Sequence, residues 1–473
     1  MKNREFGNKL LKTLFKNKEV ISVNIVGSFF EKQSIEKIGD LDIVVVCKKI
    51  SKKIFNSLNI QLLKINDLKL IKQKIIINST FGPIKITKKN HLPIHLMIYD
   101  VKSHTEHVIT SPFTCYDWER SNWNLGLKLK EIFPVKGLQF NDFIKARRNS
   151  KEYLKELQKK GISIRGYFFK RKNVYLKKRY ISIDDRNRGE FVYHIVNFLI
   201  INLHKFLIGE NIKIPEREFV KLFLKITNND KKLLNKFLFL KKQKKGSAKF
   251  YSQNIILFGK IFINKYEKFI ENYSKNLTNI TFVRHQKTKL NKTNIFLGSR
   301  SDPDIIKANY KRDIKKKYDL IITSNLKRSI STSKYFHYKK KISTELLNEI
   351  DYGEAEGLSY KLLKKKYPQI IKKWSNGKDV KFPGGENTND VKKRVIKFIK
   401  FLNKYKNKKN ILIITHSFFL RVIIGLQLKF NLAEIHKLKI QHLKEYNFIK
   451  SKNRFLTNFN RNDIKDFYKQ IYD

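Results

Sequence analysis

The chain of 473 residues is poor in several residue types, beginning with cysteine. Only Cys47 and Cys115 are present, which excludes a disulfide-rich secreted scaffold and indicates a reducing compartment. Glycine and proline number 19 and 8, and alanine occurs only five times. Acidic residues number 41 against 102 lysines and arginines, so the formal charge is +61. The scarcity of acidic residues leaves a strongly positive chain, which favours anionic partners.

Long uninterrupted apolar runs are absent as well. The first ten residues, MKNREFGNKL, lack the apolar core of a signal peptide. The most apolar segment, residues 191–207, is interrupted by two histidines and two asparagines. This pattern predicts a buried or amphipathic helix and not a membrane span. We therefore expect a cytoplasmic protein without a membrane partner.

The excess of lysine has a compositional explanation. Lysine, isoleucine and asparagine have AT-rich codons, whereas the scarce glycine, proline and alanine have GC-rich ones. An AT-rich genome that places lysine on solvated surfaces would give this composition. A chain this basic still attracts nucleic acid and anionic substrates at low salt, and the affinity falls steeply as salt rises. We expect non-specific nucleic-acid binding at low salt, and a non-catalytic basic RNA-associated protein is one alternative function.

The length predicts an α/β protein of several domains, since 473 residues exceed what one core usually supports. The two ends carry different motifs, so we expect domains at residues 1–115, 116–276 and 277–473. The middle domain is expected to be helical. Residues 141–160 and 250–276 have apolar side chains at spacings of three and four, which is typical of amphipathic helices.

The most informative segment is a short apolar strand that delivers an arginine and a histidine. Residues 281–291 read TFVRHQKTKLN. A neutral imidazole is a competent nucleophile toward phosphorus near pH 7, and a neighbouring guanidinium can hold two phosphate oxygens. Such a pair alone is more often a solvated strand end than a catalytic pair. Its interpretation therefore depends on the segments downstream.

Four further segments follow in a fixed order. They are TSNLKRSIST at 323–332, LNEIDYGEAEG at 347–357, PGGE at 383–386 with a later Arg394, and ILIITHS at 411–417. Together with the opening segment they resemble the histidine phosphatase (phosphoglycerate mutase-like) superfamily. The resemblance implies a three-layer α/β/α domain. Two positions depart from the family's motifs, because Gln286 replaces a glycine and Asn387 replaces a serine.

The resemblance also implies roles for individual residues. His285 would be the nucleophile that becomes phosphohistidine, and Glu349 the general acid and base. The remaining matches are the phosphate-neutralising Arg284, Arg328 and His416, the substrate-binding Thr288 and Asn291, and Gly298 where the family often has a glycine. A carboxyl group can first protonate the leaving oxygen and then deprotonate the attacking water if its pKa is raised. This chemistry needs no metal or other cofactor.

Phosphomonoester hydrolysis is the leading function. Phosphoglycerate mutase-type phosphotransfer is the first rival, although residues 349–357 are similar to the phosphatase branch of the superfamily. A fold kept for binding after catalysis is lost is a further alternative. The expected substrate is a phosphorylated small molecule, which the sequence does not name, and the oligomeric state is equally open.

A second constellation lies near the N-terminus. The strand VNIVGS ends in Gly27 and Ser28, and GDLDIVVV follows after a helix-length interval. Residues i and i+2 of a strand point to one face, so Asp40 and Asp42 can share divalent ions. The Gly-Ser pair can bring backbone N–H groups close to the phosphates of a nucleotide.

This pattern resembles the DNA polymerase β-like nucleotidyltransferase superfamily over roughly the first 115 residues. The resemblance implies an α+β domain that binds a nucleoside triphosphate at Gly27 and Ser28 and Mg²⁺ at Asp40 and Asp42. A nucleotidyltransferase acting on a small molecule or RNA, with an accessory phosphatase domain, is therefore another alternative function.

The third metal-binding carboxylate of that family comes from a later strand, for which residues 92–100 are the best candidate. This strand offers His95 in its middle and Asp100 only at its end. Histidine is a poor ligand for Mg²⁺, which prefers oxygen. We therefore expect nucleotide binding to outlast nucleotidyl transfer in this domain.

Overall fold

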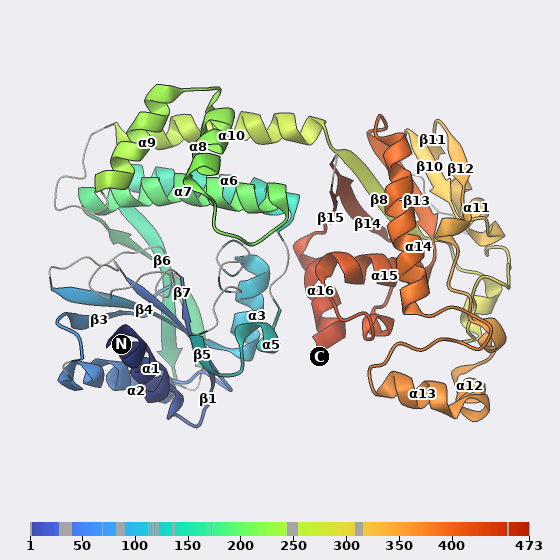
Figure 1. The fold of residues 1–473 in the computed structure, drawn as a ribbon, viewed down its shortest axis with the longest axis horizontal. Helices are drawn as coiled ribbons and strands as arrows, with labels where there is room; N and C mark the ends of the chain where they lie inside the picture. Colours follow the sequence, from blue (N-terminus) through green and yellow to red (C-terminus); the bar gives the residue numbers. More distant parts are fainter. Residues whose placement is uncertain are drawn as a thin grey trace. The chain divides into compact units, whose positions relative to one another are not determined.

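The computed structural model divides the chain into two compact units, Met1–Glu271 and Asn272–Asp473 (Figure 1). It describes residues 2–27, 40–68, 70–81, 90–111, 113, 115, 118, 123–134, 138–171, 173–243, 254–307, 316–451 and 454–472. Both cysteines are free and buried. The three-domain division of the chain, with boundaries after residues 115 and 276, stays a prediction.

The first unit contains a five-stranded mixed sheet in the order β3-β4-β2-β1-β5. The strands are β1 (Val20–Val26), β2 (Leu41–Cys47), β3 (Lys74–Asn78), β4 (His91–Asp100) and β5 (Trp123–Gly126). β2 runs parallel to β4 and antiparallel to β1. Helices α1 (Lys2–Phe15) and α2 (Lys52–Leu63) bury leucines against the face that carries Ile43 and Val45. Because side chains alternate along a strand, Asp42 lies on the opposite face.

Helices form much of the rest of this unit. They are α3 (Val101–Thr110), α5 (Leu129–Ile132), α6 (Phe140–Gln158), α7 (Asp185–Ile208), α8 (Glu216–Thr227), α9 (Lys231–Gln243) and α10 (Ile255–Lys275), with a 3₁₀ turn, η3 (Lys64–Leu68). The helices predicted at residues 141–160 and 250–276 correspond to α6 and α10. The periodicity of apolar residues was therefore a reliable signal for these two segments.

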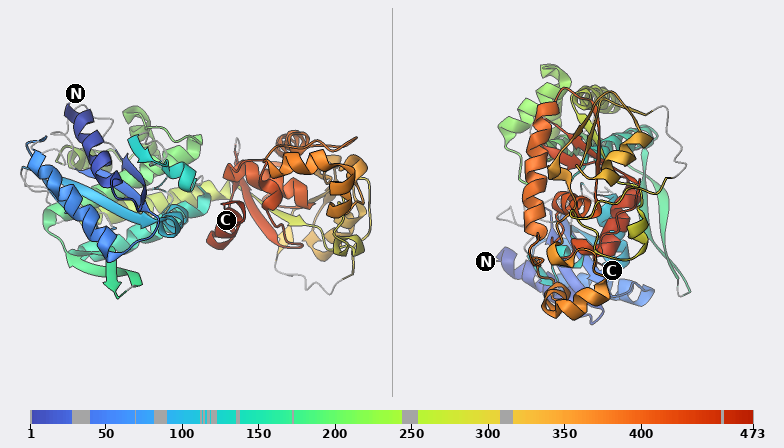
Figure 2. Two further views of the ribbon diagram at one scale, coloured as in Figure 1. Left: turned by 90° about the horizontal axis from the view of Figure 1, so that it is seen from below. Right: turned by 90° about the vertical axis from the view of Figure 1, so that its right-hand side faces the viewer.

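The region expected to be helical also contains a long β-hairpin. Strands β6 (Gly161–Lys170) and β7 (Asn173–Ser182) pair over their whole length, and Figure 2 shows them as an extended ribbon. Ile162 and Ile164 are buried and alternate with more exposed residues, which is the pattern of a strand with one packed face. The structure thus adds a two-stranded sheet to a region that is otherwise mostly helical.

Among the described residues, one helix is long and apolar enough to cross a membrane by length and composition. It is the part of α7 from Asn187 to Ile208, and 56% of its apolar window is buried inside the unit. The helix contacts α6, α8 and α9. A buried core helix meets the same criteria, so the expected lack of a membrane partner stays a prediction.

The second unit contains a six-stranded sheet in the order β12-β10-β13-β8-β14-β15. The parallel strands are β12 (Lys341–Ser343), β10 (Leu320–Thr323), β13 (Asn410–Thr415) and β8 (Thr278–Arg284). β14 (Glu445–Lys450) and β15 (Phe455–Thr457) add antiparallel pairs at one edge. Nearly every residue of β10 and β13 is buried, which is why these strands read as continuous apolar runs.

Different elements cover the two faces of this sheet. Phe282 of β8 contacts Phe398 of α14 (Thr388–Phe401) and Phe419 of α15 (Ser417–Leu428) on one face. The next residue, Val283, packs on the other face in a cluster that includes Phe336. The remaining elements are α11 (Lys327–Thr332), α12 (Tyr360–Lys366), α13 (Pro368–Ser375), α16 (Arg461–Tyr472), short strands β9 (Lys317–Tyr318) and β11 (His337–Tyr338), and 3₁₀ turns.

The four parallel strands all end at the same edge of the sheet. His285 follows β8, His416 follows β13, Ser324 follows β10, and β12 leads into the segment that contains Glu349. In open α/β sheets, ligands bind outside the carboxyl ends of the strands. Strand order therefore brings segments more than 100 residues apart in the sequence to one place.

Candidate active site

His285 stands at the centre of this edge, with only 2% of its surface exposed. Its backbone N–H donates to the carbonyl of Thr415 at 3.0 Å, and its Nδ1 lies 2.6 Å from the carbonyl oxygen of Gln286. A carbonyl oxygen only accepts, so Nδ1 carries the proton and Nε2 keeps its lone pair. Burial, with Arg328 and Arg284 nearby, lowers the pKa of His285 well below 6.5. The imidazole is therefore neutral near pH 7.

His416 lies beside His285, with the two ring centroids 5.0 Å apart. Arg328 donates from Nε to Nδ1 of His416 at 3.2 Å. A guanidinium cannot accept, so Nδ1 is unprotonated and Nε2 donates to Oγ of Ser324 at 2.7 Å. Burial and the charge of Arg328 lower the pKa of His416 well below 6.5. This second histidine is thus also neutral.

Arg328 is fully buried and is oriented by two carbonyl groups. Its NH1 donates to Ser301 and its NH2 donates to Gly298, each at 2.7 Å. A Cβ at Gly298 would lie 2.3 Å from Oε2 of Glu356, so a glycine is required there. Gly298 thus accepts a hydrogen bond from Arg328 and leaves room for the side chain of Glu356.

Arg284 enters the site from the end of β8. Its NH1 donates to the carbonyl of Ile440 at 2.8 Å. Burial lowers its pKa to about 10, which leaves the guanidinium charged at neutral pH. The site therefore holds one fully buried and one partly buried cation next to two neutral histidines, which is an environment for an anion such as phosphate.

Glu349 is buried, and its Oε1 accepts from the backbone N–H of Phe418 at 3.0 Å and of Ile350 at 3.1 Å. Burial raises its pKa, and this effect outweighs the opposing attraction of Arg328 and the backbone N–H groups. A raised pKa is the property expected of a carboxyl that must hold a proton before it gives it up.

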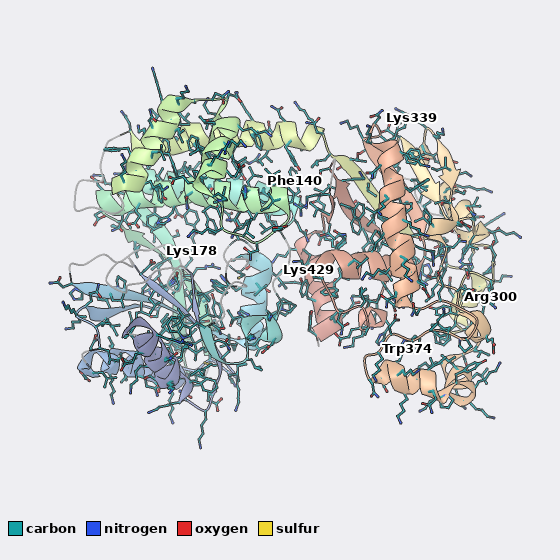
Figure 3. All side chains as sticks on the ribbon, in the orientation of Figure 1. Phe140, Lys178, Arg300, Lys339, Trp374 and Lys429 are labelled. Carbon is teal, nitrogen blue, oxygen red and sulfur yellow. The ribbon has the colours of Figure 1, made fainter. Side chains whose placement is uncertain are left out.

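Arg394 holds the segment around Glu349 in place. It pairs with both carboxylate oxygens of Glu386 at 2.8 Å, and it donates to the carbonyls of Leu346, Asn348 and Glu349. Arg300, which follows η4 and is labelled in Figure 3, pairs with Asp351, two residues after Glu349. Arg394 therefore connects Glu386 of the PGGE segment to the backbone on either side of Glu349, and this contact positions Glu349.

Thr288 and Asn291 bond to each other at the start of η4 (Lys289–Lys292). Oδ1 of Asn291 accepts from the backbone N–H of Thr288 at 2.9 Å, and Oγ1 of Thr288 accepts from the N–H of Asn291 at 3.3 Å. This reciprocal capping shapes the turn that follows His285. Direct substrate contact by these two residues stays a prediction.

A third histidine, His442, belongs to the same site and was not predicted. Its Nδ1 donates to the carbonyl oxygen of His285 at 2.6 Å, and burial lowers its pKa to about 4. It lies 157 residues after His285, in an irregular segment before β14. His442 lies outside the five motif segments and in no periodic apolar pattern. Its place in the site is therefore apparent only from the fold.

The candidate nucleotide site of the first unit lies partly within the described residues. Gly27 directly follows β1 and has φ +82°, and a Cβ there would lie 2.8 Å from Oδ2 of Asp42. Oδ1 of Asp42 is 3.0 Å from Nδ1 of His95, the residue beside it in the neighbouring strand β4. Nε2 of His95 faces the carbonyl of Thr80 at 2.8 Å. Ser28 lies outside the described residues.

Asp100 does not join this site. It pairs with Cys47 in the β2–β4 register, five residues along from Asp42 and His95, a separation of about 16 Å along the strand. Its carboxylate instead caps α3 through the N–H of Ser103. Over the described ranges, no group of three or more histidine, cysteine or acidic side chains is arranged to hold a metal ion. The described residues thus do not supply the three carboxylate ligands expected of a two-metal site.

Comparison with known proteins places the second unit in a family. The sequence model of the histidine phosphatase superfamily (branch 1) matches residues 280–457. A 2,3-bisphosphoglycerate-dependent phosphoglycerate mutase from Cytophaga hutchinsonii is 30% identical over 160 residues, which cover 31% of this chain and 75% of that protein. The chain therefore belongs to the histidine phosphatase superfamily, through its C-terminal unit.

Two further proteins are similar to this unit. Fructose-2,6-bisphosphatase from Saccharomyces cerevisiae is 37% identical over 102 residues, 21% of this chain, so the chain spans only 22% of that relative. The solved structure of the alpha-ribazole phosphatase from Shigella flexneri has 19% identity and a TM-score of 0.34, covering 39% of this chain and 97% of that one.

These comparisons confirm the predicted histidine phosphatase superfamily and the phosphoglycerate mutase-like α/β fold of the C-terminal part. They support phosphatase or phosphotransferase activity. The assignment of individual catalytic residues and the nucleotidyltransferase-like domain stay predictions.

Proposed function

We propose that the C-terminal unit hydrolyses phosphomonoesters through a phosphohistidine intermediate at His285. The main observation in support is the hydrogen bond from Nδ1 of His285 to the carbonyl of Gln286. This bond leaves the lone pair of Nε2 free to act as the nucleophile. Nε2 forms a bond to phosphorus while the bond from phosphorus to the ester oxygen breaks. Arg284 and Arg328 stabilise the charge on the oxygens of the phosphoryl group, and His416 is held beside His285 by its contacts with Arg328 and Ser324.

Glu349 supplies and then removes protons in this scheme. Burial raises its pKa, which favours the protonated carboxyl that donates to the leaving oxygen. The resulting carboxylate then takes a proton from the water that attacks the phosphohistidine, releasing inorganic phosphate and restoring neutral His285. The N–H groups of Phe418 and Ile350 hold the carboxyl in one orientation for both steps.

The substrate we propose is a phosphorylated small molecule. Both curated relatives named above have names that refer to small metabolites with two phosphate groups. A screen of phosphorylated metabolites and nucleotides, with the full chain and with His285→Ala in parallel, tests this. Release of inorganic phosphate by the unmodified protein only is expected, whether or not Mg²⁺ is present.

Phosphotransfer between two sites of a phosphoglycerate is the rival reaction, because a mutase is among the relatives. The two reactions differ in the fate of the phosphoryl group. With labelled phosphoglycerate, hydrolysis releases labelled inorganic phosphate, whereas a mutase returns the label to an isomeric ester. Net isomerisation faster than phosphate release would favour the rival.

For the first unit we propose binding of a Mg²⁺-nucleotide at Gly27, Ser28, Asp40 and Asp42. The observation that favours it is the left-handed Gly27 packed against Asp42 at the ends of β1 and β2. One Mg²⁺ held by two carboxylates would complete its shell with phosphate oxygens of the nucleotide. His95, bonded to Asp42, stands where transfer chemistry would call for a third carboxylate.

A further inference from the structure

The peptide group between His285 and Gln286 is held from both sides by side chains. Nδ1 of His442 donates to the carbonyl oxygen of His285 at 2.6 Å. The N–H of Gln286 donates to Oγ1 of Thr332 at 2.9 Å. Because this peptide group directly follows the proposed nucleophile, its orientation constrains where the imidazole of His285 points.

His442 provides a donor where the sheet no longer does. The ladder between β8 and β14 ends at the pair Val283 and Glu445, and the N–H of Leu443 then reaches the carbonyl of Arg284 at 3.0 Å. The carbonyl of His285 lies beyond this last backbone bond. A buried carbonyl without a donor lowers stability. The imidazole of His442 takes the place of the missing backbone N–H.

Thr332 connects the same peptide group to the helix that carries Arg328. Its side chain is fully buried, and its hydroxyl donates to the carbonyl of Arg328 at 2.6 Å while accepting from Gln286. One hydroxyl therefore fixes the position of α11 relative to the turn after β8. The proposed nucleophile and the proposed phosphate-binding arginine are held by a shared contact.

The constraint continues into the imidazole of His285. Nδ1 donates to the carbonyl of Gln286, which belongs to the next peptide group along the chain. The ring of His442 meets the ring of His285 edge to face, with centroids 5.3 Å apart and planes at 72°. Fixing the 285–286 peptide thus limits the positions available to Nε2.

We propose that His442 and Thr332 are positioning residues that clamp the 285–286 peptide and aim Nε2 of His285 at phosphorus. The inference rests on the proposed phosphohistidine chemistry. Neither side chain forms a bond to the substrate in this scheme, so both act through His285. A misplacement of about 1 Å can slow a reaction about 100-fold. The effect is therefore expected on the rate of phosphoryl transfer and not on substrate affinity.

The test compares variants of the full chain that remove or keep each contact. His442→Phe keeps a ring without a donor, and Thr332→Val keeps the shape without a hydroxyl. Each is expected to lower kcat about 10- to 100-fold while KM stays within about threefold. His442→Asn and Thr332→Ser keep a donor or a hydroxyl and are expected to recover most of the rate.

A matched control is Thr278→Val at the other end of β8. Thr278 is buried and donates to the carbonyl of Lys408 at 3.0 Å, so its loss removes a similar bond away from the site. Turnover is expected to stay within about twofold. Thermal unfolding and circular dichroism show that each variant is folded, and if one of the His442 or Thr332 variants fails to fold, the other decides the question.

Two results would overturn the clamp. One is a wild-type rate of phosphoenzyme formation, measured by rapid quench, in a folded His442→Phe or Thr332→Val protein. The other is a raised KM at unchanged kcat, which would indicate substrate binding. Because both residues hold one peptide group, the double variant is expected to lose less than the product of the single losses. Activity that survives His285→Ala would instead refute the proposed function.

Discussion

Nε of Arg328 lies 3.2 Å from Nδ1 of His416, and this contact determines which nitrogen of the histidine carries its proton. The guanidinium donates, so His416 is protonated at Nε2 and bonded to Ser324. A buried cation is thus coupled to a histidine that is neutral near pH 7, since burial and Arg328 keep its pKa well below 6.5. Two residues 88 positions apart act as one unit.

Arg328→Lys is the first test of this coupling. Lysine keeps a positive charge but loses the planar fork that donates to Gly298, Ser301 and His416 together. We expect kcat to fall about 10²- to 10³-fold, the usual effect of removing one oriented donor to transition-state charge. The exposed Lys327→Arg variant is the control. Equal rates for Arg328→Lys and the unmodified protein would show that charge alone suffices.

Glu349→Gln tests the proposed acid and base. The amide can still accept from the N–H of Phe418 but cannot transfer a proton, so kcat is expected to fall about 10²- to 10⁴-fold. Glu345→Gln, four residues upstream on the surface, is expected to leave turnover unchanged. Because burial raises the pKa of Glu349, the unmodified enzyme loses its acid form as pH rises past that pKa. We expect kcat/KM of the unmodified enzyme to fall on the alkaline side of its pH profile. In Glu349→Gln this alkaline fall is expected to be absent.

The buried histidines predict lower stability in acid. Burial lowers the pKa of His285 and His416 well below 6.5 and that of His442 to about 4. The unfolded chain therefore binds protons near pH 6.5 that the folded chain does not. Their stabilisation is fully present above pH 6.5 and is lost progressively as the pH falls from 6.5 toward the lowered values.

Scanning calorimetry between pH 7 and pH 5 measures this effect. We expect Tm to fall with pH, and we expect His442→Asn to reduce that fall because asparagine does not titrate. His337→Asn on β11 is the matched control. A fall that is equal in His442→Asn and the unmodified protein would exclude His442 as a source of the pH dependence.

Asp42→Ala tests the proposed nucleotide site of the first unit. Removal of this carboxylate is expected to abolish binding of Mg²⁺-nucleotide in a calorimetric titration of the full chain, because it takes away one of two proposed ligands. Phosphatase turnover is expected to be unchanged. Asp67→Ala, in η3, controls for loss of an acidic residue elsewhere in the unit. Absence of binding by the unmodified protein in Mg²⁺ or Mn²⁺ would refute the site.

The C-terminal site was readable from the sequence because each part sits at the end of a buried strand. Short apolar runs that end in Arg284-His285 and Thr415-His416 predict both the strands and their common edge, and the structure places them there. His442 could not be predicted, since its contact depends on the path of an irregular segment across the sheet edge. Thr332 was visible within a motif, but its contact with Gln286 required the fold.

In the first unit, the prediction of structure from sequence failed for a different reason. The sequence put His95 in the middle of the strand expected to supply a third carboxylate, and in the structure the β2–β4 register pairs His95 with Asp42. The β6–β7 hairpin was missed because its many lysines and arginines obscured the alternation of Ile162 and Ile164 with polar residues. Composition can thus hide a strand whose partner is the next strand in the chain.

The central claim is that His285 carries the phosphoryl group, and trapping that intermediate tests it most directly. The full chain is mixed with a ³²P-labelled phosphomonoester found by the substrate screen, quenched in alkali within milliseconds, and digested for mass spectrometry. We predict an acid-labile, alkali-stable phosphoryl group on His285, which forms faster than inorganic phosphate is released and is absent from His285→Ala. Rapid turnover without such an intermediate, or a phosphoryl group on another residue, would contradict the account.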